Sequence, residues 1–186
     1  MKTSDKKNEI LDCAQALIQR CGYNGFSYAD ISIAVGIRKA SIHHHFPTKV
    51  DLAVAVIERY EEVFNASLSN INSQKDWLEK VRHYTELYKQ VLGEDKLCLC
   101  GMLASDMETL PENLKTAVRS FLSGNADWLV EVLADNSQLS KKRLINIAWQ
   151  IINQLQGGIM MARILEDPAI FSDSCAELLS QLKHLP

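Results

Sequence analysis

Glycine and proline are scarce in this chain of 186 residues, which contains only eight of the first and four of the second. Both residues interrupt regular structure, and an all-β fold with many short strands needs them at its turns. Hydrophobic residues make up 47% of the chain and charged residues 23%, which excludes a disordered or collagen-like chain. The composition therefore predicts a folded protein dominated by long helices.

The sequence also lacks long apolar runs. No stretch of 18 residues is free of polar breaks, so we expect no membrane-spanning helix, and no apolar run follows the basic residues of segment 1–15, so we expect no signal peptide. The cysteines are odd in number and have no Cys-x-x-Cys spacing; they are Cys13, Cys21, Cys98, Cys100 and Cys175. Free thiols in a reducing compartment are the simplest interpretation, so we expect a cytoplasmic protein.

Catalytic signatures are missing as well. The sequence has no Glu-x-x-His pair, phosphate-binding glycine loop, nucleophile elbow or dinucleotide-binding turn. The triplet His43–His45 is not a metal site by itself, because successive helix residues point about 100° apart and three such imidazoles cannot converge on one ion. We therefore expect no enzyme, no metal and no cofactor.

A strong positive charge is the last absence, since the net charge is −3. The charge is nevertheless uneven along the chain. Residues 1–52 carry seven Lys and Arg against five Asp and Glu, whereas residues 53–186 carry 13 against 18. This asymmetry indicates that the N-terminal part meets an anionic partner.

Helix signals divide the N-terminal part into short segments. Ser27 is followed three residues later by Asp30, the spacing of a capping box at a helix start. Gly36 is suited to end that helix in a left-handed turn. A further helix is expected over 39–46, where Pro47 ends it.

Similar signals predict the later helices. The pair Thr48 and Asp51 forms a second capping box and starts a long helix that reaches about residue 70. Ser73 and Asp76 have the same spacing and predict another helix start. Pro111 suits the first position of a helix that runs to about residue 134.

Two short helices joined through a glycine turn form a helix-turn-helix. On the second helix, Ile42 and Phe46 lie four residues apart on the face expected to be buried. The other face carries the small and polar side chains of Lys39, Ala40, Ser41, His43 and His44. Small side chains allow close approach to the major groove, and polar ones can bond to base edges. The alternative is a three-helix cluster with a solvated face, as in a helical adaptor that binds protein.

The segments 22–31 and 36–52 resemble the N-terminal domain of the TetR family of bacterial transcriptional regulators. The resemblance covers about residues 6–60 and rests on capping residues, a turn glycine, a helix-ending aromatic residue, a proline and a lysine in order. It implies an all-α fold with an N-terminal three-helix helix-turn-helix domain and a C-terminal helical bundle that dimerises. We assign 1–50 to DNA binding and 51–186 to effector binding and dimerisation. The function implied is a ligand-responsive repressor that binds a palindromic operator in double-stranded DNA.

The resemblance also implies roles for individual residues. Ser27 stands where a hydroxyl residue contacts a phosphate, and Lys49 stands where a lysine pairs with the DNA backbone. The residues implied on the recognition helix are Lys39, Ala40, Ser41 and His44. Arg38 replaces the usual Ser or Thr cap, which removes about 1 kcal/mol of capping energy but adds a cation near phosphates. His43 replaces a tyrosine that contacts phosphate, and would make that contact sensitive to pH.

Segment 144–165 predicts an interface, because apolar residues occur all round it and Arg163 is its one charge. A helix of this kind must be covered on every side, and a small domain covers only one. We expect a homodimer through about 141–165 and 169–185, with Gly157 and Gly158 allowing close approach of another helix. A fully internal core helix is the alternative. The family resemblance implies the same dimer.

The resemblance further implies an effector pocket in the C-terminal bundle, where a small molecule of unknown identity shifts the DNA-binding heads. Few basic residues lie in that region, which favours an apolar or cationic effector. The candidate lining residues are Trp77, Tyr84, Tyr88, Met102, Met107, Trp128, Trp149 and Gln154. Ordinary core packing is the alternative for each of them.

Cys98 and Cys100 lie two residues apart, close to Lys96. A reactive thiolate needs exposure and a positive neighbour, so a redox-sensing or electrophile-sensing regulator is an alternative function. The competing interpretation is that both cysteines are small, buried hydrophobic residues.

Overall fold

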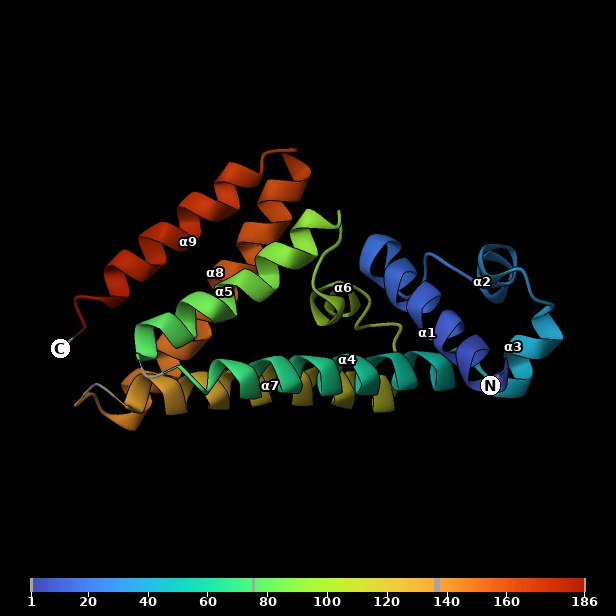
Figure 1. Cartoon of the computed structure of the whole chain (residues 1–186), viewed down its shortest axis with the longest axis horizontal. Coiled ribbons are helices and arrows are strands. Elements are labelled where there is room, and N and C mark those ends of the chain that lie inside the picture. Colours follow the sequence, from blue (N-terminus) through green and yellow to red (C-terminus); the bar gives the residue numbers. More distant parts are fainter. Residues whose placement is uncertain (1, 75, 136–137, 186) are drawn as a thin grey trace. The chain divides into compact units, whose positions relative to one another are not determined.

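The computed structural model describes residues 2–74, 76–135 and 138–185, and in these ranges it contains nine α-helices and no strand (Figure 1). The helices are α1 (Lys2–Cys21), α2 (Tyr28–Val35), α3 (Lys39–His45), α4 (Lys49–Ile71), α5 (Trp77–Gly93), α6 (Leu99–Ser105), α7 (Glu112–Ala134), α8 (Lys141–Ile164) and α9 (Pro168–Leu182). The predicted all-α class is confirmed. Over the described residues, none of the helices combines the length and apolar character needed to cross a membrane.

Both N-terminal capping boxes are present. Before α2, the Ala29 N–H donates to Ser27 Oγ over 3.2 Å, and the Ser27 N–H donates to Asp30 Oδ2 over 2.7 Å. Before α4, the Thr48 N–H donates to Asp51 Oδ2 and the Asp51 N–H donates to Thr48 Oγ1. These reciprocal bonds satisfy backbone donors that a helix start leaves without partners, so the start of each helix is encoded locally.

The expected capping box at Ser73 is wrong. The N-cap of α5 is Asp76, whose side chain accepts a hydrogen bond from the Glu79 N–H. The Ser73 hydroxyl instead donates to the Asn70 carbonyl at the end of α4. A serine can cap a following helix or bond back to a preceding one, and here α4 extends far enough to take it.

The chain divides into two compact units. Unit 1 comprises residues 1–63 and 98–121, and unit 2 comprises residues 64–97 and 122–186. Helices α4 and α7 each have residues in both units. The predicted boundary near residue 50 divides the chain by expected function, whereas these two units divide it by contacts. That boundary therefore stays a prediction.

Unit 1 packs α1, α2, α3 and α6 with the first parts of α4 and α7. Its fully buried apolar side chains include Ile10, Ala14, Ile18, Ile31, Ile42, Leu52, Leu99, Leu103 and Leu114. In α1 the fully buried residues Ile10, Ala14 and Ile18 follow one another at intervals of four, the spacing of a helix with one buried face. This core holds α2 and α3 in place while their outer sides stay open.

Unit 2 packs α5, α8 and α9 with the remaining parts of α4 and α7. Gly158 of α8 lies against α9, because a Cβ atom built there would stand 3.1 Å from a ring atom of Phe171. The close approach expected at the glycine pair is therefore made by α9 of the same chain. At Gly157, no atom of the described residues lies within 4 Å of the corresponding position, apart from the chain neighbours and the backbone of α8 itself.

Candidate nucleic-acid interface

The turn between α2 and α3 is fixed by local bonds. Gly36 has φ 67°, the left-handed conformation that glycine adopts without a steric penalty, and its N–H donates to the Ser32 carbonyl. The Ser32 hydroxyl donates to the Ile37 carbonyl over 2.5 Å. At the start of α2, hydrogen bonds from the Ser27 hydroxyl and N–H hold the pKa of the Asp30 carboxyl below its ordinary value. The helix-turn-helix predicted from these residues is formed.

Helix α3 has one buried and one open side. Ile42 is fully buried and Phe46 is 4% exposed, so the inner stripe predicted from their spacing is confirmed. The exposed residues are Arg38, Lys39, Ala40, Ser41, His43 and His44. Arg38 occupies the N-cap position of α3, and its side chain makes no hydrogen bond to the backbone of the helix. The missing cap is expected, because a guanidinium has no acceptor for a backbone N–H.

A concavity of about 450 Å³ lies between α2, α3 and the start of α4, lined by Phe26, Ser27, Tyr28, Ala29, Lys39, His43 and Lys49. Two of these side chains are lysines, and one is an imidazole. The N-terminus of α2 opens at the same place and adds its positive dipole end. The surface is therefore suited to a negatively charged group.

Lys49 is tied into its own unit. Its ammonium lies 4.6 Å from the ring centroid of Tyr23 and 4.1 Å from that of Phe26, and it donates a hydrogen bond to the Phe26 carbonyl. Burial lowers the pKa of Lys49. This lysine thus fastens the loop before α2 to the start of α4, in addition to lining the concavity.

Tyr28 and His43 also line the concavity. The Tyr28 hydroxyl lies 2.9 Å from the Phe46 carbonyl and 2.6 Å from the Thr48 carbonyl, so it holds the end of α3 against the start of α4. Burial, with a smaller effect of Asp51, raises the pKa of Tyr28 to about 12. The His43 ring packs edge-on against the Tyr28 ring, with 4.7 Å between centroids.

Sequence reasoning missed Asp106, which follows α6 and binds the loop between α1 and α2. Its Oδ2 accepts from the Tyr23 N–H over 2.7 Å, and its Oδ1 accepts from the Asn24 amide over 3.0 Å. The same amide donates to the Thr109 hydroxyl over 2.7 Å. Gly22 has φ 77°, and a Cβ there would lie 2.8 Å from Asp106 Oδ2, so the contact also needs glycine. No sequence pattern links residues this far apart.

Three of the effector candidates come together inside unit 2. The rings of Tyr84 and Trp128 stack with 5.4 Å between centroids, and the Tyr84 hydroxyl lies 3.4 Å from that of Tyr88. The buried side chain of Asn125 accepts from the Tyr84 hydroxyl over 3.0 Å, and the Gln156 amide lies 3.5 Å from the Tyr88 hydroxyl. These five residues, the α5–α7–α8 cluster, are a polar group within an apolar bundle.

The other five candidates lie elsewhere. Trp77 and Trp149 are half-buried in unit 2, and the Gln154 amide donates to the Ser174 carbonyl of α9 over 2.9 Å. Met102 and Met107 belong to unit 1. The eight residues therefore do not line one cavity.

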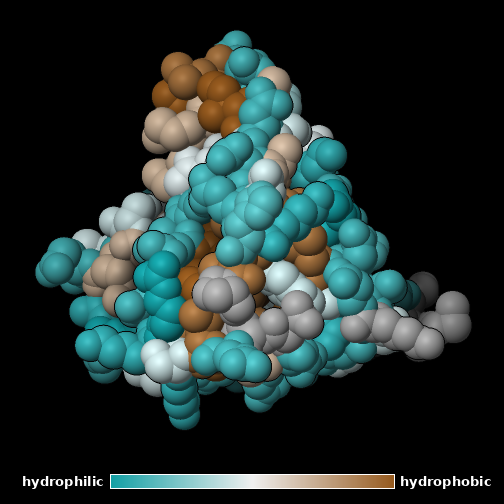
Figure 2. Space-filling view, turned by 90° about the vertical axis from the view of Figure 1, so that its left-hand side faces the viewer, coloured by the Kyte–Doolittle hydropathy of each residue, from teal (hydrophilic) through white to brown (hydrophobic). Residues whose placement is uncertain are grey.

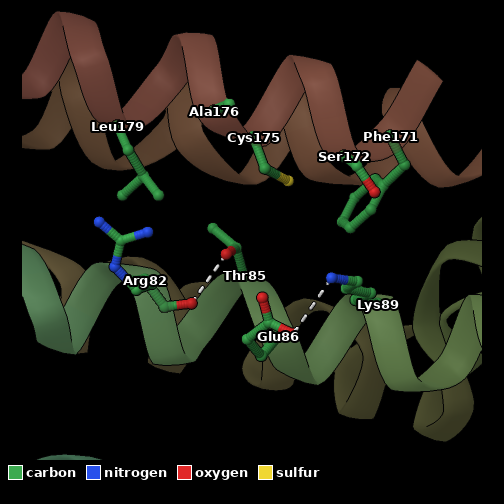
Figure 3. Close-up of a pocket in the computed structure, with 9 residues that line it drawn as sticks. All are labelled: Arg82, Thr85, Glu86, Lys89, Phe171, Ser172, Cys175, Ala176 and Leu179. Atoms are coloured by element: carbon green, nitrogen blue, oxygen red, sulfur yellow. Dashed lines mark hydrogen bonds and ion pairs between the residues drawn. The ribbon is translucent and has the colours of Figure 1, made fainter. Parts of the chain in front are cut away.

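A smaller cavity of about 120 Å³ lies between α5 and α9, and none of the eight candidates lines it (Figure 3). Its walls are Arg82, Thr85, Glu86 and Lys89 from α5 and Phe171, Ser172, Cys175, Ala176 and Leu179 from α9. Burial, helped by the charge of Glu86, raises the pKa of the Cys175 thiol to about 11. Charged and apolar side chains share this cavity.

Cys98 and Cys100 are both buried in unit 1, with exposed fractions of 3% and 0%. Burial raises the pKa of Cys100 well above its ordinary value, the opposite of what thiolate reactivity needs. Lys96 donates to the Glu94 carboxylate over 2.5 Å. The observations favour the interpretation of both cysteines as packed hydrophobic residues.

Comparison with known proteins places this geometry in a family. Residues 10–56 match the family described as "Bacterial regulatory proteins, tetR family". A TetR transcriptional regulator from Legionella pneumophila is 35% identical, with a TM-score of 0.91 over 97% of this chain and 99% of that one. A TetR-family regulator from Agrobacterium tumefaciens is 34% identical, with a TM-score of 0.90 over 96% and 97%. The HTH-type transcriptional regulator CymR of Pseudomonas putida is 24% identical over 84% of this chain and 78% of its own length.

Proposed function

This chain belongs to the TetR family of bacterial transcriptional regulators, and from that premise we propose that it is a ligand-responsive repressor that binds a palindromic operator as a homodimer. Family membership by itself gives the general function, that of a DNA-binding transcriptional regulator. The observation that carries the proposal is the open side of α3, where Lys39, Ala40, Ser41 and His44 are exposed while Ile42 is buried.

The proposed base contacts come from that open side. Ala40 and Ser41 are short enough for the helix backbone to enter the major groove, where Ser41 and His44 can bond to base edges. Lys39 and Arg38, at the N-terminal end of α3, supply charge for the flanking phosphates. Ser27, Lys49 and the N-terminus of α2 supply the remaining backbone contacts.

The proposed dimer uses the outer side of α8 and α9. A groove of about 440 Å³ runs along these helices, lined by Arg143, Ile147, Gln150, Ile151, Asn153, Gln154, Leu178, Gln181, Leu182 and Leu185. Further along α8, Met161 is 45% exposed and Ile164 is 66% exposed. Figure 2 shows hydrophobic surface at the top, the end at which α8 leads into α9. A second copy would cover this surface and place two α3 helices about a two-fold axis.

The proposed effector site is the α5–α7–α8 cluster. The buried Tyr84, Tyr88 and Asn125 and the half-buried Gln156 place hydroxyl and amide groups inside an apolar bundle, which suits a largely apolar molecule with one polar group. Binding would shift DNA affinity only to the extent that the effector prefers one conformation of the dimer.

Footprinting of the DNA upstream of the protein's own gene tests the proposal. We expect two protected half-sites related by a dyad, with centres about one turn of DNA apart or somewhat more. We also expect a reporter driven by that DNA to increase when the gene is deleted. Protection of a single half-site at saturating protein, or a reporter that falls on deletion, would contradict the dimeric repressor.

A further inference from the structure

One histidine of the concavity on unit 1 can bind a phosphate in only one of its protonation states. His43 is exposed on α3, and its Nδ1 lies 3.0 Å from the Pro47 carbonyl oxygen. A carbonyl oxygen only accepts hydrogen bonds, so this contact requires a proton on Nδ1. In the neutral imidazole the other nitrogen, Nε2, then carries a lone pair and no proton.

The lone pair on Nε2 matters because the concavity is suited to a negatively charged group. Its lining includes Lys39 and Lys49, whose positive charges attract an anion. A phosphate oxygen also only accepts hydrogen bonds, so neutral His43 and a phosphate would bring two acceptors together. Protonation removes the conflict, since the imidazolium donates from Nδ1 to Pro47 and from Nε2 to the phosphate.

We propose that His43 binds a DNA backbone phosphate only as the imidazolium, so that each subunit takes up a proton when it binds DNA. This inference rests on the proposed DNA-binding function. It makes the uptake of a proton part of the DNA-binding equilibrium. The protein then binds DNA more tightly as the pH falls.

The other titratable groups around His43 do not supply this dependence. On α2, Tyr28 has a pKa raised to about 12 by burial, so its phenol is neutral between pH 6 and pH 8. Lys39 on α3 and Lys49 on α4 are cations that favour phosphate, and they stay charged between pH 6 and pH 8. Proton uptake therefore accompanies the arrival of the phosphate.

Backbone contacts do not depend on sequence, so the test needs no operator. The affinity of the full-length protein for a mixed-sequence 40-base-pair duplex is measured at low salt between pH 6 and pH 8. For the wild type we expect a loss on the order of fivefold per histidine across this range. His43→Lys, a permanent cation, should bind at pH 8 about as tightly as the wild type at pH 6. His43→Gln, which is never charged, should bind weakly, and both variants should lack the pH dependence.

His83→Gln is the matched control, because it removes an exposed imidazole from α5 of unit 2, away from the residues that line the concavity and from the open side of α3. It should keep the pH dependence of the wild type. A His43→Gln variant with the wild-type pH dependence would overturn the inference while leaving DNA binding intact. Failure of the wild type to bind the duplex at any pH would overturn the proposed function and this inference with it.

Discussion

The open side of α3 and the open side of α8 are both exposed, but their chemistry is opposite. On α3 the exposed side chains are small, polar or basic, whereas the end of α8 and its C-cap expose Met160, Met161, Ile164 and Leu165. Covering a polar face with another protein contributes little free energy, because little apolar area is removed from water. An apolar face has no charges with which to bind phosphates. The difference agrees with the two proposed partners, DNA for the first surface and a second copy for the other.

The largest effect is expected from charging the apolar surface. Met161→Glu with Ile164→Glu would place two unpaired carboxylates in the proposed dimer interface, where desolvation opposes association. The dimer dissociation constant should rise by about a hundredfold or more, since the interaction lost exceeds about 3 kcal/mol. Analytical ultracentrifugation measures this directly.

The control for that variant is Ile33→Glu. Ile33 is 83% exposed on α2, so the same substitution is made on an exposed isoleucine of unit 1. It should leave the dimer unchanged. A Met161→Glu, Ile164→Glu protein that remains dimeric would place the interface elsewhere.

Removal of the Asp106 carboxylate comes next. Asp106→Ala removes the acceptor of the part-buried Tyr23 N–H, a bond to a charged group that contributes about 1.5–3 kcal/mol, whereas water can replace the carboxylate at the exposed Asn24 amide. We expect unit 1 to lose about 1–3 kcal/mol of stability and DNA affinity to fall on every sequence alike. Urea unfolding and a mixed-sequence duplex report the two effects.

Glu108→Ala, an exposed acid two residues further on, is the matched control and should change neither quantity. Unchanged unfolding of Asp106→Ala would show that the loop between α1 and α2 holds its position without this carboxylate.

Substitutions on the open side of α3 should alter preference more than affinity. Ser41→Ala or His44→Ala removes a proposed base contact, each worth about 1–3 kcal/mol of discrimination between bases. Lys49→Ala should instead weaken binding to all sequences equally, since phosphates carry no base identity. Selection from a random duplex library compares the three, and identical behaviour would contradict the assignment of the contact face.

The smallest effect concerns the cap of α2. Ser27→Ala removes a side-chain cap worth about 1 kcal/mol of stability. The folded-state pKa of Asp30 is lowered by its bonds to Ser27, so this contribution is present above the unfolded value near 3.9 and is lost as the pH falls through the lower folded value. Thermal unfolding should therefore show a smaller difference between the variant and the wild type as the pH falls below about 3.9 than it shows at pH 7. An equal difference at both pH values would show that Asp30 takes no part.

Much of the α3 surface follows from the sequence because its determinants are local. The boxes at Ser27 and Thr48, the turn at Gly36 and the spacing of Ile42 and Phe46 each act within a few residues, and all were predicted. The family resemblance added roles that spacing alone does not supply, and these stay predictions until they are tested.

The missed features depend on distant partners. Asp106 looks like an unremarkable acid after a short helix until Tyr23 and Asn24 are brought to it in three dimensions. In the same way, Trp77 and Tyr84 were both predicted to line the effector pocket because both are aromatic. Tertiary packing decides which aromatic residues are in contact, and it places Tyr84 against Trp128. The capping box predicted at Ser73 was wrong because the Ser73 hydroxyl bonds back to Asn70 of the preceding helix.

The most direct test of the central claim is the salt dependence of binding to a mixed-sequence duplex, with a charge reversal on the open side of α3. For the wild type, the logarithm of the binding constant should fall linearly with the logarithm of salt, with a slope of about −0.9 for each neutralised phosphate. Lys39→Glu should flatten that slope and weaken binding at low salt. Binding that is independent of salt, or that Lys39→Glu leaves unchanged, would contradict the claim that this surface meets DNA.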